Sequence, residues 1–171
     1  MRKIQFFFGV GKIATDDKND LVFYTVNSII DLTNVIIPHF LNNPLLTHKQ
    51  ADFLLFKLAV DSINCKQHLN IEGLRKIVEI KASINKGLNV TLIEAFPDIV
   101  PVNRPKVILP STIDPNWLVG FTDGEGCFNI NIISSKTHKI GTQVKVRFIL
   151  PQHSRDLDLM RKLVQFLGAV F

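Results

Sequence analysis

Glu125 is the residue whose type and position could do chemistry, because it places a carboxylate at the end of a predicted helix. Asp114 followed by Pro115 is a favourable helix start, since aspartate accepts a hydrogen bond from the first turn and proline fits the first helical position. Gly126 is predicted to end the helix in the left-handed conformation. A carboxylate in the last turn faces the negative end of the helix dipole, which costs stability unless a cation or basic group compensates. The pattern indicates a metal-ligating carboxylate at Glu125.

Residues 118–126, Leu-Val-Gly-Phe-Thr-Asp-Gly-Glu-Gly, resemble the LAGLIDADG motif of homing endonucleases. The resemblance implies two such helices packed side by side, with the small residues Gly120 and Gly124 letting the backbones approach. It also implies that the acid at each helix end helps to hold divalent metal, and Glu125 matches that acid. Full-length proteins of this family hydrolyse phosphodiester bonds in double-stranded DNA, so the expected cofactor is Mg²⁺. An ordinary buried helix with a solvated acid at its end is the alternative.

The start of the chain is echoed near its end, which indicates an internal duplication. Met-Arg-Lys-Ile-Gln-Phe at residues 1–6 is similar to Met-Arg-Lys-Leu-Val-Gln-Phe at residues 160–166, and Gly9 and Gly168 follow the two copies. An offset of 160 − 1 = 159 residues is too long for a solenoid repeat and favours a duplicated domain, as in two-motif LAGLIDADG proteins. The expected domains are residues 1–100, the C-terminal part of the first repeat; 101–113, a linker; and 114–171, the N-terminal part of the second repeat.

The expected fold class is α+β and LAGLIDADG-like, with antiparallel sheets, helices packed on one face and a truncated duplicated domain. On this reading the first motif and the end of the second repeat are absent, so the chain supplies one of two expected carboxylates. The sequence does not decide whether the isolated chain is an enzyme. Two alternatives stay open: an RNA maturase that binds intron RNA without cleaving it, and an inactive remnant of an intron-encoded reading frame. The motif helix could also pair with its copy in a second chain, which would make the protein self-associate.

Two alternating runs follow the motif, residues 127–135 and 142–150, and they predict a hairpin. Alternate residues of a strand share a face, so Phe128, Ile130 and Ile132 lie together on an apolar face that the sheet can bury. The other face would offer amides and cations to the base edges and phosphates of double-stranded DNA. A solvated polar face is the simpler alternative. The predicted DNA-binding residues are Asn129, Asn131, Ile133, Ser135, Lys136, Lys139, Gln143, Lys145 and Arg147.

Composition agrees with a folded protein that has a polyanionic partner. The 171 residues are 46% hydrophobic and carry a net charge of +5, and the isoelectric point is about 9.3. Cys65 and Cys127 are isolated, so neither a zinc site nor a disulfide framework is indicated. No apolar run is long enough to span a membrane, and Gln5 interrupts the basic and apolar start that imitates a signal peptide. Abundant Ile, Asn, Lys and Phe are typical of AT-biased codons, which favours a mitochondrial, organelle-encoded gene.

The remaining pattern predicts a second hairpin and five further helices. Pro38 should bend one of these helices, and the closely spaced prolines from Pro97 to Pro110 exclude regular structure there. The expected core stripes are Ala51, Leu54, Leu55, Leu58 and Ser62 on one helix, and Leu74, Ile77, Val78 and Ile84 on the next. The predicted ranges are strands at 10–14 and 21–26, and helices at 1–8, 28–40, 47–65 (from a Thr47–Gln50 capping box), 70–87 (from an Asn70 cap to Gly87) and 155–167.

Overall fold

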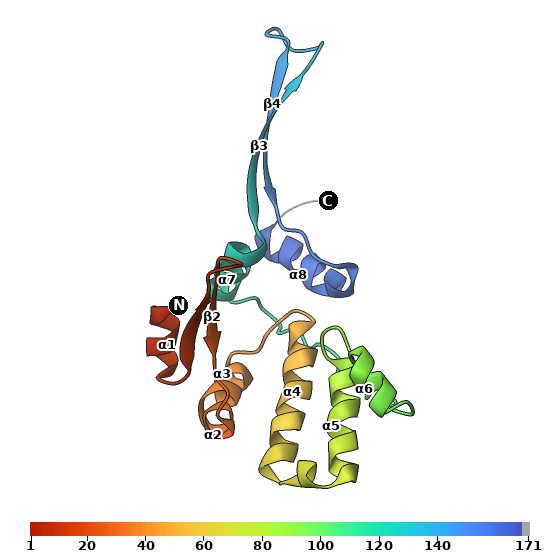
Figure 1. The fold of residues 1–171 in the computed structure, drawn as a ribbon. Coiled ribbons are helices and arrows are strands. Elements are labelled where there is room, and N and C mark those ends of the chain that lie inside the picture. The colour runs from red at the N-terminus through yellow and green to blue at the C-terminus, as the bar shows by residue number, and fades with distance from the viewer. Residues whose placement is uncertain (169–171) are drawn as a thin grey trace. The chain divides into compact units, whose positions relative to one another are not determined.

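A computed structural model describes residues 1–168 of the chain (Figure 1). The fold is of the predicted α+β class, with helices and two small antiparallel sheets of two strands each. Its contacts divide it into two compact units, Met1–Val107 and Ile108–Phe171. Within the described part, no helix has both the length and the apolar character needed to cross a lipid bilayer.

The first unit begins with a helix and a hairpin, as predicted. Helix α1 (Arg2–Phe8) ends at Gly9, which has a φ of 68°. Strand β1 (Lys12–Asp16) pairs with β2 (Leu21–Thr25). The prediction started β1 two residues too early, because Gly11 turns the chain with a φ of 83° before the strand begins. A side chain at Gly11 would also meet the ring of Tyr24 at 2.7 Å, so only glycine fits there.

The helix predicted from Ser28 is divided into three parts. The Ser28 hydroxyl accepts a hydrogen bond from the Asp31 amide at 3.3 Å and so caps the first turn. Helix α2 (Ile29–Asp31) continues into a π-helical turn, η1 (Leu32–Ile36), and then into α3 (Ile37–Asn42). Pro38 lies in the first turn of α3, where its missing N–H leaves little unsatisfied. The distortion predicted near Pro38 is therefore the π-helical turn just before it.

Helices α4 (Lys49–Asn64) and α5 (Ile71–Ser83) pack together, with the 3-10 turn η2 (Gln67–Leu69) between them in the chain. The stripe predictions are partly wrong, because Leu58 is 49% and Leu74 is 40% exposed. Leu58 lines an open cleft that residues of both helices form, and this cleft leaves its side chain accessible. The buried apolar residues of the pair are Ala51, Leu55, Val60, Val78 and Ile80.

The caps of these two helices differ in how well the sequence predicts them. Asn70 accepts a hydrogen bond from the Gly73 amide at 2.9 Å, as expected of a helix cap. The capping box at Thr47 is wrong, since the Gln50 side chain donates to the Leu45 carbonyl at 2.7 Å. The predicted end at Gly87 is also wrong, because α5 stops at Ser83 and the chain turns extended at the next residue.

A short helix, α6 (Val90–Ala95), was not predicted. Asn89 caps it by accepting a hydrogen bond from the Leu92 amide at 2.9 Å. Beyond it, Arg75 of α5 donates to the Asp98 carboxylate at 2.5 Å, and this hydrogen bond lowers the pKa of Asp98. Arg75 is thus engaged within the first unit and is not a free basic group.

Residues 97–113 contain no helix or strand, as the prolines predicted. The earlier part of this segment is nevertheless attached to the first unit. Arg104 forms an ion pair with Asp52 of α4 at 2.9 Å, and the Ser83 hydroxyl donates to the Val102 carbonyl at 2.6 Å. The division between the units falls after Val107.

The second unit consists of a helix, a hairpin and another helix (Figure 1). Helix α7 (Pro115–Glu125) is followed by β3 (Cys127–Ser134), β4 (Thr142–Ile149), the 3-10 turn η3 (Ser154–Asp156) and α8 (Leu157–Leu167). Both strands agree with the prediction to within one residue. Helix α8 buries Leu159 and Leu163, which are at most 2% exposed. It ends at Gly168 with a φ of 65°, so the two echoed segments share a left-handed glycine cap as well as a sequence.

Candidate nucleic-acid interface

Glu125 is the last residue of α7 and lies two residues before β3. The helix begins as predicted, with the Asp114 carboxylate accepting a hydrogen bond from the Asn116 amide at 2.8 Å. Glu125 is exposed, and within residues 1–168 its carboxylate makes no hydrogen bond or ion pair. The dipole penalty expected from the sequence is thus not relieved by any basic group in this part of the chain. The carboxylate is free to take an external cation.

Gly126 joins this carboxylate to the sheet by a close backbone contact. The predicted left-handed conformation is wrong, since Gly126 has an extended backbone with φ −79° and ψ 147°. Its amide donates to the Thr122 carbonyl at 2.7 Å. A Cβ atom at Gly126 would lie 2.6 Å from both that oxygen and the Thr122 Cγ2. Glycine is therefore required by the lack of space, and the junction holds Glu125 at the base of the hairpin.

One face of α7 is uncovered along its glycines. Gly120 and Gly124 are four residues apart and so lie on the same side of the helix. Among the described residues 1–168, a Cβ atom added at either glycine would meet no atom within 4 Å outside its own stretch of helix. Trp117 and Phe121 stack beside this face, with ring centroids 4.7 Å apart. The structure leaves room for another element to approach the backbone of α7 closely.

The polar face predicted for the hairpin is formed by cross-strand pairs. Residues directly opposite each other in an antiparallel pair share a face. The Arg147 guanidinium donates to the Asn129 side-chain oxygen at 3.3 Å, which links one such pair. The pairs of this face that carry polar side chains are Asn129 with Arg147, Asn131 with Lys145, and Ile133 with Gln143.

The apolar face of the same hairpin, which the sheet could bury, is exposed in the described chain. Phe128 is 82% exposed and Val146 is 75% exposed. An isolated two-stranded sheet can bury a face only against another layer. Within residues 1–168 the large apolar side chains of this face stay exposed, and they lie opposite one another in cross-strand pairs. These pairs are Phe128 with Phe148, Ile130 with Val146, and Ile132 with Val144.

The loop at the tip of the hairpin, residues 135–141, is closed by backbone hydrogen bonds. The Ser135 amide donates to the Gly141 carbonyl at 2.9 Å, and the Gly141 amide donates to the His138 carbonyl at 2.8 Å. Ser135 thus lies just beyond β3, and its hydroxyl contacts His138 rather than the strand face. Lys136 and Lys139 are exposed in this loop.

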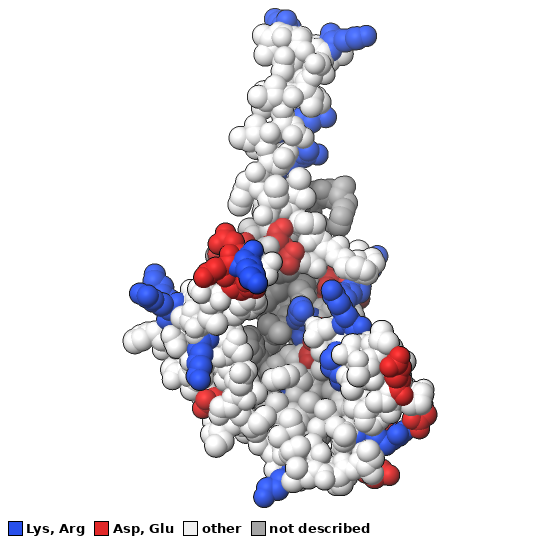
Figure 2. Space-filling view, viewed as in Figure 1, with Lys and Arg blue, Asp and Glu red and all other residues white. Residues whose placement is uncertain are grey.

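The hairpin as a whole is positively charged. No aspartate or glutamate occurs from residue 126 to residue 150. In Figure 2 the hairpin accordingly carries blue lysine and arginine atoms and no red ones. A surface of one sign beside amide side chains can attract phosphate and orient a nucleic acid along the strands.

The residues present do not form a complete metal site by themselves. No group of three or more His, Cys, Asp and Glu side chains that could hold an ion exists within residues 1–168. Glu125 can supply one oxygen ligand, whereas Asp123 lies two residues earlier, on a different side of the helix. Divalent cations such as Mg²⁺ need about six oxygen ligands, several of which can be water or substrate phosphate. A divalent ion held by Glu125 would therefore need further ligands from outside residues 1–168.

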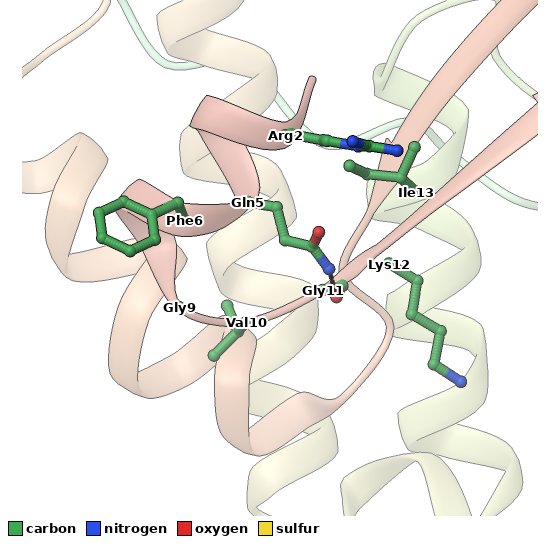
Figure 3. A pocket seen from close by; sticks show the side chains of 8 residues that line it. All are labelled: Arg2, Gln5, Phe6, Gly9, Val10, Gly11, Lys12 and Ile13. Carbon is green, nitrogen blue, oxygen red and sulfur yellow. Dashed lines mark hydrogen bonds between the residues drawn. The ribbon is translucent and has the colours of Figure 1, made fainter.

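A large open cleft in the first unit offers no competing chemistry. It has a volume of about 1070 Å³ and lies between α1 and β1 (Figure 3). The Gln5 side chain crosses it and donates to the Gly11 carbonyl at 2.9 Å. Arg2 and Lys12 are its only charged lining residues, and none of the lining residues is an acid, a histidine or a cysteine.

Comparison with known families agrees with these features. A model of the LAGLIDADG endonuclease family matches residues 1–60 and 118–170. The chain belongs to the LAGLIDADG endonuclease family. The second matched block contains most of the motif helix α7, the whole hairpin and all of α8.

The curated LAGLIDADG relatives are intron-encoded proteins. The chain is 43% identical to probable intron-encoded endonuclease 3 of Neurospora crassa, over 96% of this chain and 31% of that protein. It is 37% identical to probable intron-encoded endonuclease 2 of the same organism, over 94% of this chain and 36% of that protein. A 50.9 kDa protein in ND4 intron 1 of Podospora anserina is 43% identical over 39% of this chain and 14% of its own length. The chain spans about a third of the first two relatives.

Solved structures of the same family share the fold. The LAGLIDADG homing endonuclease I-SmaMI, bound to cleaved DNA, is 40% identical with a TM-score of 0.92, over 99% of this chain and 57% of that one. The meganuclease I-CpaMI, bound to uncleaved DNA, is 42% identical with a TM-score of 0.89, over 98% of this chain and 57% of that one. The chain therefore corresponds to a little over half of each solved enzyme.

Proposed function

We propose that this chain is a segment of an intron-encoded homing endonuclease that binds double-stranded DNA and contributes one carboxylate to a metal-dependent cleavage centre. The observation that carries the proposal is the tight junction at Gly126. It joins the unpaired carboxylate of Glu125 to a hairpin with a cationic and amide-bearing face. I-SmaMI and I-CpaMI, which share this fold, are both bound to DNA in their crystals.

Glu125 would be this chain's ligand to the divalent metal, which we propose to be Mg²⁺. When bound, such a metal activates water and stabilises the departing oxygen of a phosphodiester. One I-SmaMI structure, with uncleaved DNA, contains calcium ions. The contribution of this chain is to hold a negative, exposed carboxylate at a fixed position beside the proposed DNA-binding face.

The open face of α7 would receive a second motif helix that brings the other carboxylate. That helix could belong to the remainder of a two-repeat protein or to a second copy of this chain. We accordingly assign residues 1–100 to the first repeat, 101–113 to the linker and 114–171 to the second repeat, on the echoed helices α1 and α8 with their matching glycine caps. The intron-encoded relatives, one of them in an intron of the mitochondrial gene ND4, support an organelle-encoded origin.

Substituting Gly120 with alanine tests separately the stability of α7 and its proposed pairing with a second motif helix. Because a Cβ atom there meets open space, Gly120→Ala should stabilise the 171-residue chain by up to about 1 kcal/mol. In a chimera completed with the rest of I-SmaMI, the same change should lower cleavage, since the helices can no longer approach. Urea unfolding and cleavage of target DNA measure the two effects. Full cleavage by a stabilised Gly120→Ala chimera would contradict the proposed helix pairing.

Binding to duplex DNA should depend strongly on salt through the hairpin. Replacing Lys145 and Arg147 with glutamine should reduce the slope of log affinity against log salt by about two, because each cation releases about one counterion from DNA. Fluorescence anisotropy with labelled duplex DNA measures the slope. Glutamine at Lys76 and Lys86, two exposed lysines of the first unit, is the matched control and should leave it unchanged.

Two results of that titration would count against the proposal. Duplex affinity that is equal at low and high salt would exclude binding by this face. Much tighter binding to intron RNA than to duplex DNA, without cleavage, would favour the maturase alternative.

A further inference from the structure

Three side chains at the tip of the hairpin form a continuous chain of hydrogen bonds. The Thr137 hydroxyl lies 3.2 Å from the Ser135 hydroxyl, and the Ser135 hydroxyl lies 2.7 Å from Nδ1 of His138. Thr137 also reaches the same ring nitrogen at 3.4 Å. The backbone bonds that close the loop at Gly141 hold these residues together. The imidazole is thus held by its Nδ1 edge.

This arrangement leaves the other edge of the imidazole available. His138 is exposed, and within residues 1–168 its Nε2 has no hydrogen-bond partner. If Thr137 donates to Ser135 and Ser135 donates to Nδ1, the proton of the neutral ring must lie on Nε2. Hydroxyl groups rotate freely, so donation from Thr137 to Ser135 and on to Nδ1 costs little. Consecutive hydrogen bonds in such a chain also strengthen one another. His138 would then present a single outward N–H donor.

We propose that His138 binds a backbone phosphate of DNA through Nε2–H, and that Ser135 positions it by fixing the tautomer. The proposal rests on the proposed function, since it requires duplex DNA along the hairpin. It adds a residue that the alternation of the strands does not indicate, because His138 lies in the loop. It also gives the hydroxyl of Ser135 a role through His138 instead of direct contact with DNA.

Charge and position favour phosphate over a base edge as the partner. Lys136 and Lys139 stand on either side in the sequence, and no carboxylate occurs between residues 126 and 150. A phosphate oxygen can accept a hydrogen bond from a single N–H donor whatever the DNA sequence. One base is distinguished from another best by two hydrogen bonds from the same side chain. One neutral donor between two lysines is suited to anchoring the backbone.

Alanine at His138 tests the contact in the 171-residue chain. The affinity for duplex DNA should fall about ten-fold, the effect of one hydrogen bond to a charged group. The salt slope should stay unchanged, because a neutral donor displaces no counterion. Alanine at Lys136 should instead lower that slope by about one. Alanine at His153, an exposed histidine outside the loop, is the matched control.

A double-mutant cycle tests the positioning by Ser135. Ser135→Ala should weaken binding in the wild-type background and have no further effect in the His138→Ala background. Equal losses in both backgrounds would show that Ser135 contacts DNA directly and would overturn its role. Unchanged affinity in His138→Ala would overturn the phosphate contact. The proposed function would stand despite that result if replacing Lys145 and Arg147 still reduced the salt dependence of binding. If that salt dependence stayed unchanged as well, both proposals would fail.

Discussion

Replacing Glu125 with glutamine in the completed chimera is expected to lower DNA cleavage on the order of a thousand-fold while leaving DNA affinity nearly unchanged. Glutamine keeps the size of the side chain and one oxygen but loses the negative charge that holds a divalent cation. Glu125 lies before the hairpin and not on its polar face, so the contacts proposed for binding remain. Single-turnover cleavage with Mg²⁺ and anisotropy without metal measure the two effects.

Asp123 provides the control for this prediction. It is an exposed acid of the same helix, two residues before Glu125 and on a different side. Asp123→Asn removes the same charge, so a general effect of net charge would appear equally in both variants. Cleavage at the wild-type rate by the Glu125→Gln chimera would remove Glu125 from the cleavage centre.

Gly126→Ala, which adds a single methyl group, is expected to lower stability more than the same addition elsewhere in the second unit. Its Cβ atom would lie 2.6 Å from the Thr122 carbonyl oxygen, a backbone atom that cannot rotate away. The helix end must shift, which should cost the chain about 2 kcal/mol of unfolding free energy and displace Glu125. A displacement of about 1 Å at a catalytic group can cost a hundred-fold in rate. Urea unfolding and chimera cleavage would both report the change.

A second substitution identifies which contact is responsible. Thr122→Ser removes the Cγ2 atom that also lies 2.6 Å from the added Cβ, but it keeps the carbonyl oxygen. Combined with Gly126→Ala, it should therefore restore little stability. A double variant as stable as the wild type would assign the glycine requirement to the side chain, and an unperturbed Gly126→Ala would show that the junction tolerates movement.

The sequence predicts the strands of the hairpin well because their pattern is local. Alternation with a period of two assigns each residue to a face, and the observed register places the predicted polar residues of one strand opposite those of the other. Burial is a different matter. The exposure of Phe128 and Val146 could not be predicted, since it depends on whether another layer packs against the sheet.

The caps show the same division between local and distant interactions. Asn70 and Asp114 cap their helices as predicted, because each needs only an amide two or three residues away. The capping box at Thr47 does not form, since Gln50 has an alternative acceptor in the Leu45 carbonyl. Sequence patterns identify the residues that can bond, and the surrounding chain decides which of several partners they take.

For the candidate site, the motif and the strand pattern indicated Glu125 and the polar face, whose roles in metal and DNA binding stay predictions. His138 was not among the predicted residues. Its signal is the contact of its ring with the Ser135 hydroxyl, which depends on how the seven residues of the loop fold. A loop without periodicity gives no indication from sequence of which side chains meet.

The alternation of the hairpin also has a consequence for how such a protein can evolve. Each polar cross-strand pair, such as Asn131 with Lys145, projects from the face opposite to the apolar pairs. Substitutions in a polar pair therefore leave the packing residues unchanged, and each pair can vary without the others. Under the proposed function, a lineage whose target sequence drifts can follow it by one or two codon changes at a time, without changing the apolar face of the hairpin.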